Sequence, residues 1–83
     1  MSGFEEPEQA PPWREGDGPR PRVSCWPAGA RPALYVTLRR GGRAEERYAP
    51  VTARHDYQDG RVAYHVEIKV VDGTVHRAYW AAG

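Results

Sequence analysis

The sequence predicts a small all-β domain in which four or five antiparallel strands form a meander that curls toward an SH3-like barrel, behind a disordered N-terminal segment. Three observations predict it: side chains alternate between apolar and polar, glycine-containing turns separate the alternating runs, and apolar residues nowhere recur with a helical period. The alternation is clearest over residues 61–80. There Val66 and Ile68 fall on one face and His65 and Glu67 on the other, so we expect a half-buried sheet.

The dipeptide Asp72-Gly73 divides this run into two strands, Arg61–Val71 and Thr74–Trp80. Asp-Gly between alternating runs is the strongest short-range signal of a β-hairpin, because a type I′ turn requires a positive φ at both central residues. A two-residue turn centred on this dipeptide places Val70 opposite Val75. We therefore expect a hairpin at the C-terminal end of the chain.

The preceding residues contain further alternating runs. Residues 33–40 form one predicted strand, and Gly41-Gly42 ends it in a second hairpin whose return strand is residues 44–54. A second Asp-Gly turn, Asp59-Gly60, leads into the C-terminal hairpin. A short run over Val23–Trp26 brings the number of predicted strands from four to five.

The register of the Gly41-Gly42 hairpin is open to two interpretations. A strict two-residue loop would place Leu38 opposite Glu45, which turns a charge toward the apolar face. One extra loop residue, in a bulged turn, would instead bring Tyr48 opposite Val36. We expect the bulged turn, because it keeps the charges on the outer face.

The apolar faces of these strands supply the predicted core. We also expect at least one of Cys25 and Trp26 to be buried, because both residue types are frequent in protein interiors. The other expected core residues are Leu34, Val36, Leu38, Tyr48, Val51, Val62, Tyr64, Val66, Ile68, Val70, Val75 and Tyr79.

Residues 1–22 form the predicted tail, and residues 23–83 form the domain. The tail holds five of the eight prolines and carries five acidic residues against three arginines, so we expect a disordered, Pro-rich, acidic segment. The domain carries eight arginines and one lysine against six acidic residues. Phe4 and Trp13 are the large apolar residues of the tail. They are either solvated or loosely packed, or they anchor a partner, or the tail folds back over a groove.

The composition argues against a disulfide-bonded, zinc-binding or membrane-spanning protein. Cys25 is the only cysteine, so the chain can form no intramolecular disulfide and no cysteine-based zinc site. The acidic, Pro-rich N-terminus lacks the apolar segment of a signal peptide, and no run of apolar residues is long enough to span a membrane. We therefore expect a cytoplasmic protein that does not associate with membranes.

No catalytic or metal-binding motif is present, so we expect no enzyme activity, no cofactor and no metal site. The mixture of arginine and aromatic residues on loops and outer faces instead favours a binding role. We expect a protein partner or a homodimer, bound through a sheet edge or an aromatic face; nucleic acid is the alternative. The candidate binding residues are Arg39, Arg40, Arg43, Arg54, Tyr57, Arg61, His65, Lys69, His76 and Trp80.

The segments 48–55, 59–65 and 77–80 resemble small actinobacterial proteins of unknown function that are associated with mobile elements. The resemblance extends over about residues 33–80 and agrees with the abundance of Arg, Ala, Gly and Pro in the chain. It implies a bacterial, cytoplasmic protein. It implies no site residues, because such a family has no assigned chemistry.

Overall fold

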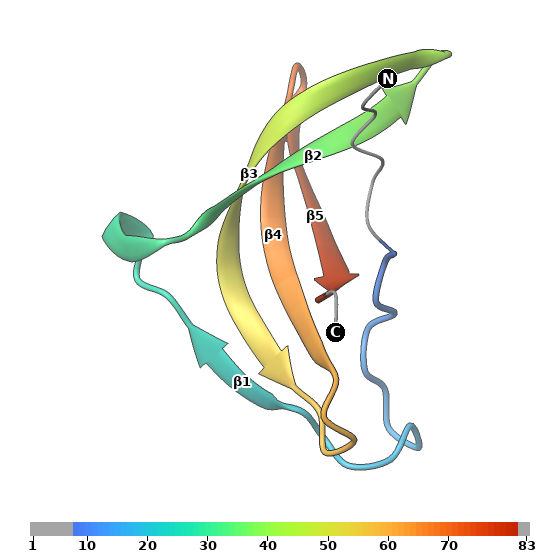
Figure 1. Cartoon of the computed structure of the whole chain (residues 1–83), viewed down its shortest axis with the longest axis vertical. Coiled ribbons are helices and arrows are strands. Elements are labelled where there is room, and N and C mark those ends of the chain that lie inside the picture. Colours follow the sequence, from blue (N-terminus) through green and yellow to red (C-terminus); the bar gives the residue numbers. More distant parts are fainter. Residues whose placement is uncertain (1–7, 82–83) are drawn as a thin grey trace.

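A computed structural model describes residues 8–81 of the chain, and its regular structure in this part is almost entirely β-strand (Figure 1). The expected fold class is confirmed: five antiparallel strands form one sheet that curls into a half-barrel. The elements are β1 (Arg22–Cys25), a short 3-10 helix η1 (Ala28–Ala30), β2 (Ala33–Arg40), β3 (Arg43–Asp56), β4 (Val62–Val70) and β5 (Gly73–Trp80). These bounds agree with the predicted strands to within two residues.

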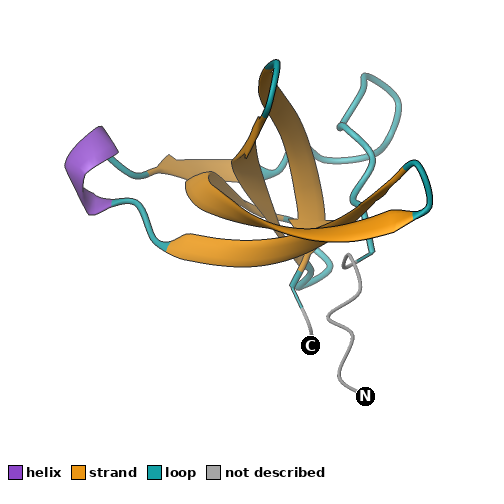
Figure 2. Ribbon diagram, turned by 90° about the horizontal axis from the view of Figure 1, so that it is seen from above, coloured by secondary structure: helices purple, strands orange, loops and turns teal. Residues whose placement is uncertain are grey.

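The longest strand, β3, organises the sheet. Its first half pairs with β2, and its second half pairs with β1 and β4, while β5 pairs with β4. The register of β3 against β4 shifts between Val51 and Ala53, because β3 contains one extra residue, Thr52. Such a bulge bends a strand and increases its twist. Figure 2 shows the result, in which the strands curve around one side of the molecule without closing a ring.

The core lies on the concave side of this curved sheet. Its fully buried members come from β2, β3, β4 and β5, and half-buried Trp26, Tyr64, Val70 and Val75 pack against them. The predicted burial of one residue of the Cys25 and Trp26 pair is thus partly confirmed, while Cys25 is exposed. The buried cluster consists of Val36, Leu38, Ala49, Val51, Val66, Ile68 and Tyr79.

The predicted bulged turn after β2 is wrong. Gly41 and Gly42 form a two-residue turn with φ of 58° and 79°, the positive values that a type I′ turn requires. Leu38 is consequently opposite Glu45. This register moves Tyr48 to the outer face, where 49% of its surface is exposed, so its predicted place in the core is also wrong. Sequence patterning failed here because the glycine pair determines the loop length more strongly than the charges determine the face.

The inward charges are accommodated by pairing with each other. Arg47 lies opposite Val36 on the concave face, and its guanidinium contacts the Glu45 carboxylate at 2.7 Å. Both side chains are about one-third exposed, so water still screens the pair. The buried Nε of Arg47 has no hydrogen-bond partner among the described residues. Leu34, at the same edge of the core, is 38% exposed, so its predicted burial is wrong as well.

The register of the β4–β5 hairpin also differs from the expectation. Val70 lies opposite Gly73, and Ile68 lies opposite Val75, so the turn residues are Val71 and Asp72. A type I′ turn centred on Asp72-Gly73 would need a positive φ at Asp72, and no described residue other than glycine has one. The shift is two residues, which leaves each side chain on its predicted face.

Part of the expected disordered tail has a defined position beside the sheet. Gln9 forms an antiparallel bridge with Tyr79, and two main-chain hydrogen bonds flank the bridge. Ala10 N donates to Ala78 O at 2.8 Å, and Trp80 N donates to Glu8 O at 3.0 Å. The open edge of β5 supplies these groups, a source of order that composition alone does not reveal. Residues 1–7, which include Phe4, lie outside the described part of the chain.

Candidate functional site

The outer edge of β2 is an open edge of the sheet, as is that of the shorter, fully exposed β1. In an antiparallel hairpin closed by a two-residue turn, alternate residues direct their main-chain N–H and C=O groups toward the partner strand. Val36 and Leu38 therefore bond to β3, whereas Tyr35, Thr37 and Arg39 direct these groups away from it. Within residues 8–81, no main-chain hydrogen bond satisfies this outer edge.

Exposed side chains accompany the open edge on its convex face. Tyr35 is 65% exposed and contacts Tyr48 edge to face, with 5.7 Å between the ring centroids. Arg39 is exposed and lies on the same face of β2 as Tyr35, because the two residues are four positions apart along a strand. We call Tyr35, Thr37 and Arg39, with the neighbouring Tyr48, the β2 edge. From the sequence Tyr48 is expected in the core, whereas Tyr35 is expected on the outer face with the aromatic and arginine residues that favour binding.

Arg39, Arg40 and Arg43 lie beside the β2–β3 turn in the sequence, and the exposed side chains of Arg39 and Arg43 lie on different faces of the hairpin. Arg43 lies opposite Arg40, on the face of β2 that alternates with that of Arg39. Glu46 lies opposite Thr37, on the same face as Arg39, and reduces the local positive charge. The hairpin therefore offers the exposed Arg39 beside tyrosines rather than a concentrated basic patch.

At the other end of the sheet, three predicted binding residues come together. The Tyr57 and Trp80 rings lie 5.3 Å apart, and Cζ of Arg61 lies 3.6 Å from the centroid of the Trp80 ring. Trp13 of the tail lines the same shallow pocket, which has a volume of about 480 Å³. The Trp13 ring is itself covered by Arg20, whose Cζ lies 4.9 Å from its centroid. We call Trp13, Tyr57, Arg61 and Trp80 the aromatic pocket.

The contacts of the aromatic pocket are made within the chain. Arg61 occupies the face of Trp80 as a cation–π partner, and the tail covers part of the pocket. This arrangement supports the interpretation that the tail folds back over a groove. Trp13 is the member of the pocket that is not among the predicted binding residues, because its position in a Pro-rich segment gives no signal of which strand it lies beside.

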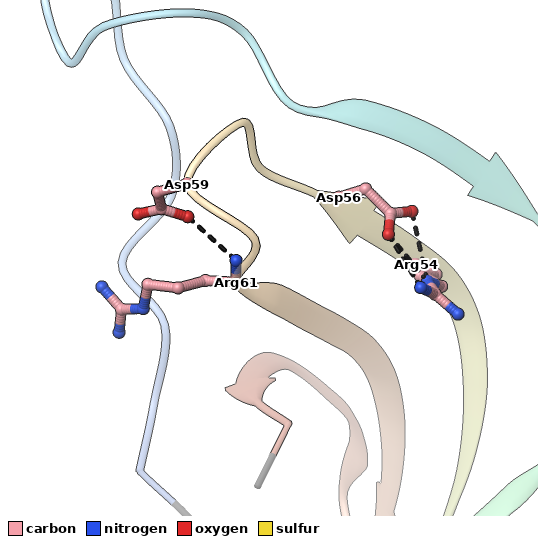
Figure 3. A network of polar contacts seen from close by, with 4 residues as sticks. All are labelled: Arg54, Asp56, Asp59 and Arg61. Carbon is pink, nitrogen blue, oxygen red and sulfur yellow. Dashed lines mark hydrogen bonds and ion pairs between the residues drawn. The ribbon is translucent and has the colours of Figure 1, made fainter. Parts of the chain in front are cut away.

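Two aspartates near the pocket have local structural roles, which Figure 3 shows. Asp59 Oδ1 accepts a hydrogen bond from the main-chain N–H of Arg61 at 2.9 Å, as expected for a turn aspartate. Asp56 accepts hydrogen bonds from Nε and Nη2 of Arg54, at 2.8–3.1 Å. These bonds and the charge of Asp56 raise the pKa of Arg54. The Arg54 guanidinium is thus already engaged by a carboxylate, which weakens its predicted role in binding a partner.

The histidines separate into a pair and a single residue. The rings of His55 and His65 stack at 3.8 Å between centroids. Burial lowers the pKa of His55 below its ordinary value; burial and, second, the charge of His55 lower that of His65. His76 is exposed and lies opposite Glu67, and Lys69 lies opposite Thr74. Within the described residues, no three His, Cys, Asp or Glu side chains are grouped to hold a metal ion.

The predicted binding residues therefore occupy both ends of the sheet and do not form one surface. The chain matches no family model, no curated protein and no solved structure. The resemblance to actinobacterial proteins consequently stays a prediction. In residues 8–81 no helix is long and apolar enough to cross a membrane.

Proposed function

We propose that this domain is a non-enzymatic interaction module that accepts an extended segment of a protein partner on the β2 edge. The observation that carries the proposal is the row of outward main-chain groups at Tyr35, Thr37 and Arg39, which have no partner in the described chain. Adding a strand to such an edge forms main-chain hydrogen bonds, and alternate side chains supply specificity. Tyrosine and arginine side chains beside the edge are the types enriched among residues that dominate interface energies.

The opposite edge of the same sheet supports this mode of binding. Glu8 and Ala10 already add to the edge of β5 through two main-chain hydrogen bonds. They show the geometry that we propose for a partner on β2. The tail leaves the β2 edge uncovered within the described residues, so this edge is available to another chain.

The variant Thr37→Pro tests the proposal. Proline removes the outward N–H of residue 37 and is tolerated on edge strands, so the bonds from β2 to β3 remain. We expect Thr37→Pro to fold with a native circular dichroism spectrum and to lose partner binding in a pull-down with immobilised protein. Thr37→Val, which keeps the N–H, serves as the matched control and should retain binding. Equal capture by Thr37→Pro and the wild type would contradict strand addition at this edge.

Binding of single-stranded nucleic acid is the second candidate. The exposed Tyr35 and Tyr48 rings beside Arg39 favour it, because bases stack on aromatic side chains while arginine contacts phosphate. Fluorescence polarisation with labelled single-stranded DNA and RNA at two salt concentrations tests it. The nucleic-acid function requires affinity that falls with salt, weakens in Tyr35→Ala and is unchanged in Thr37→Pro. Absence of binding at low salt removes this candidate.

A further inference from the structure

We infer that the segment accepted by the β2 edge is the β2 edge of a second copy of this chain, joined in antiparallel register about a two-fold axis at Thr37. This inference rests on the proposed function and names its partner. An isologous interface brings the same surface patch from both copies together, so residues on either side of the axis must complement each other. The order of residues along β2 meets this condition.

The main-chain groups complement each other in this register. Thr37 lies opposite Thr37 of the second copy, and Tyr35 lies opposite Arg39. All of these residues direct their main-chain groups outward. Each opposed pair can therefore exchange two N–H···O=C bonds, which gives about six bonds across the axis. A register centred on Tyr35 or on Arg39 would leave the outward groups of two of the three residues without a partner from the same row.

The side chains favour the same register. Each exposed Tyr35 ring faces an Arg39 guanidinium of the other copy on the convex face, an arrangement suited to a cation–π contact. Arg39 is available for this contact, because within the described residues it has no ion pair. A register centred on Arg39 would instead oppose two like charges, which is destabilising. Tyr48 lies beside Tyr35 and widens the aromatic surface that the second copy meets.

The concave face adds an apolar contact. Val36 of one copy lies opposite Leu38 of the other in this register, so the two cores become continuous at the edge. Leu34, which is 38% exposed in the single chain, lies at the end of this row. One pair of strands buries less surface than a standard protein interface of about 1,600 Å². We therefore expect a dimer that dissociates on dilution, with Kd on the order of 1–100 µM.

Sedimentation equilibrium of the full chain, from about 1 µM to 1 mM, measures this association. We expect the wild type to change from monomer to dimer over this range. Tyr35→Arg opposes arginines across the axis, and we expect it to raise Kd at least about tenfold. The double variant Tyr35→Arg/Arg39→Glu opposes arginine and glutamate instead, and it should restore the wild-type Kd to within about threefold. Rescue of this kind reports the register, because residues 35 and 39 of the two copies lie opposite each other when Thr37 lies on the axis. Both positions are exposed in the single chain, so we expect the variants to fold.

A cross-link tests the position of the axis independently. Opposed residues of a hydrogen-bonded pair have Cα atoms about 5.5 Å apart, within the range of disulfides. In a Cys25→Ser background, which removes the single exposed native thiol, Thr37→Cys should form a covalent dimer on mild oxidation. Glu46→Cys is the matched control: residue 46 pairs with Thr37 on the neighbouring strand, one strand further from the axis, and should not cross-link.

The outcomes separate this inference from the proposed function. A dimer that Thr37→Pro abolishes, that Tyr35→Arg weakens and that the double variant Tyr35→Arg/Arg39→Glu restores supports both this inference and the proposed function. A dimer lost in Thr37→Pro but indifferent to Tyr35→Arg overturns the register. A wild type that stays monomeric to 1 mM overturns the second copy as partner, while a partner captured by wild type and not by Thr37→Pro still supports strand addition. A dimer that Thr37→Pro leaves intact overturns the β2 edge as the interface.

Discussion

The β5 and β2 edges of the sheet differ in whether the chain itself forms hydrogen bonds with them. At β5 the chain uses its own tail: Glu8 and Ala10 form hydrogen bonds with the edge, and Trp13 joins Tyr57 and Trp80 in a pocket. At β2 the described chain supplies no partner, and exposed tyrosines flank the unpaired main-chain groups. An unpaired edge exposes a protein to aggregation, so an edge left open beside aromatic residues is more readily explained by a binding function.

The largest expected effect concerns the core that supports both edges. Val66 on β4 is 1% exposed and contacts the cluster that joins the two hairpins. Val66→Asp would bury a charge with no partner, and we expect it to abolish cooperative unfolding in urea. Val71→Asp, at a position 90% exposed in the β4–β5 turn, is the control and should unfold as the wild type does. Cooperative unfolding of Val66→Asp at wild-type stability would contradict the core described here.

The next effect tests whether main-chain hydrogen bonds hold the tail on the edge of β5. Ala10→Pro removes the N–H that donates to Ala78 O, and we expect it to lower the free energy of unfolding by about 1 kcal/mol. The amide of Trp80 should then exchange faster with deuterium. Gln9→Pro is a matched control, because no described hydrogen bond uses the N–H of Gln9. Equal effects of the two prolines would show that the hydrogen bond to Ala78 does not hold the tail.

A smaller effect comes from the stacked histidines near the tail. The pKa of both His55 and His65 is lowered in the folded chain, so the unfolded chain binds more protons below its ordinary histidine pKa of about 6.5. The free energy of unfolding should therefore fall as the pH drops through about 6.5 toward the lowered values. The double variant His55→Gln/His65→Gln should flatten this dependence. Stability that rises on acidification over this range would contradict the assigned direction.

The smallest effect concerns the aromatic pocket. Arg61→Gln removes the cation above the Trp80 ring, which at an exposed site contributes about 0.5–1 kcal/mol. We expect a loss of stability of that size, a change in tryptophan fluorescence and no change in association through the β2 edge. Arg43→Gln, exposed at the other end of the sheet, should leave the tryptophan fluorescence unchanged. An Arg61→Gln variant that loses partner binding would move the functional site to the aromatic pocket.

Local patterns predicted the elements well. Alternation and glycine turns located the strands to within two residues, and the buried positions Val66, Ile68 and Tyr79 followed from their faces. Register was harder, because it depends on turn conformation. Gly41 and Gly42 adopt positive φ and a two-residue loop, and Asp72 does not adopt the positive φ that a type I′ Asp-Gly turn requires.

The candidate site was less accessible from the sequence than the fold. Tyr57, Arg61 and Trp80 were identified as binding residues, and the structure brings them together at one end. Of the β2 edge, the alternation predicts the outward positions of Tyr35 and Arg39, but the register error places Tyr48 in the core. Which edge remains open depends on contacts between residues far apart in the sequence, such as Glu8 with Trp80. Periodicity within a strand carries no information about such contacts.

Amide hydrogen exchange of the wild type at low and high protein concentration tests the central claim most directly. The amides of Val36 and Leu38, which bond to β3, should be protected at both concentrations. Those of Tyr35, Thr37 and Arg39 should exchange rapidly in dilute protein and become protected as the concentration rises. Protection of Thr37 in dilute protein would show that the chain itself covers the edge. Rapid exchange at both concentrations would contradict association of two copies through β2.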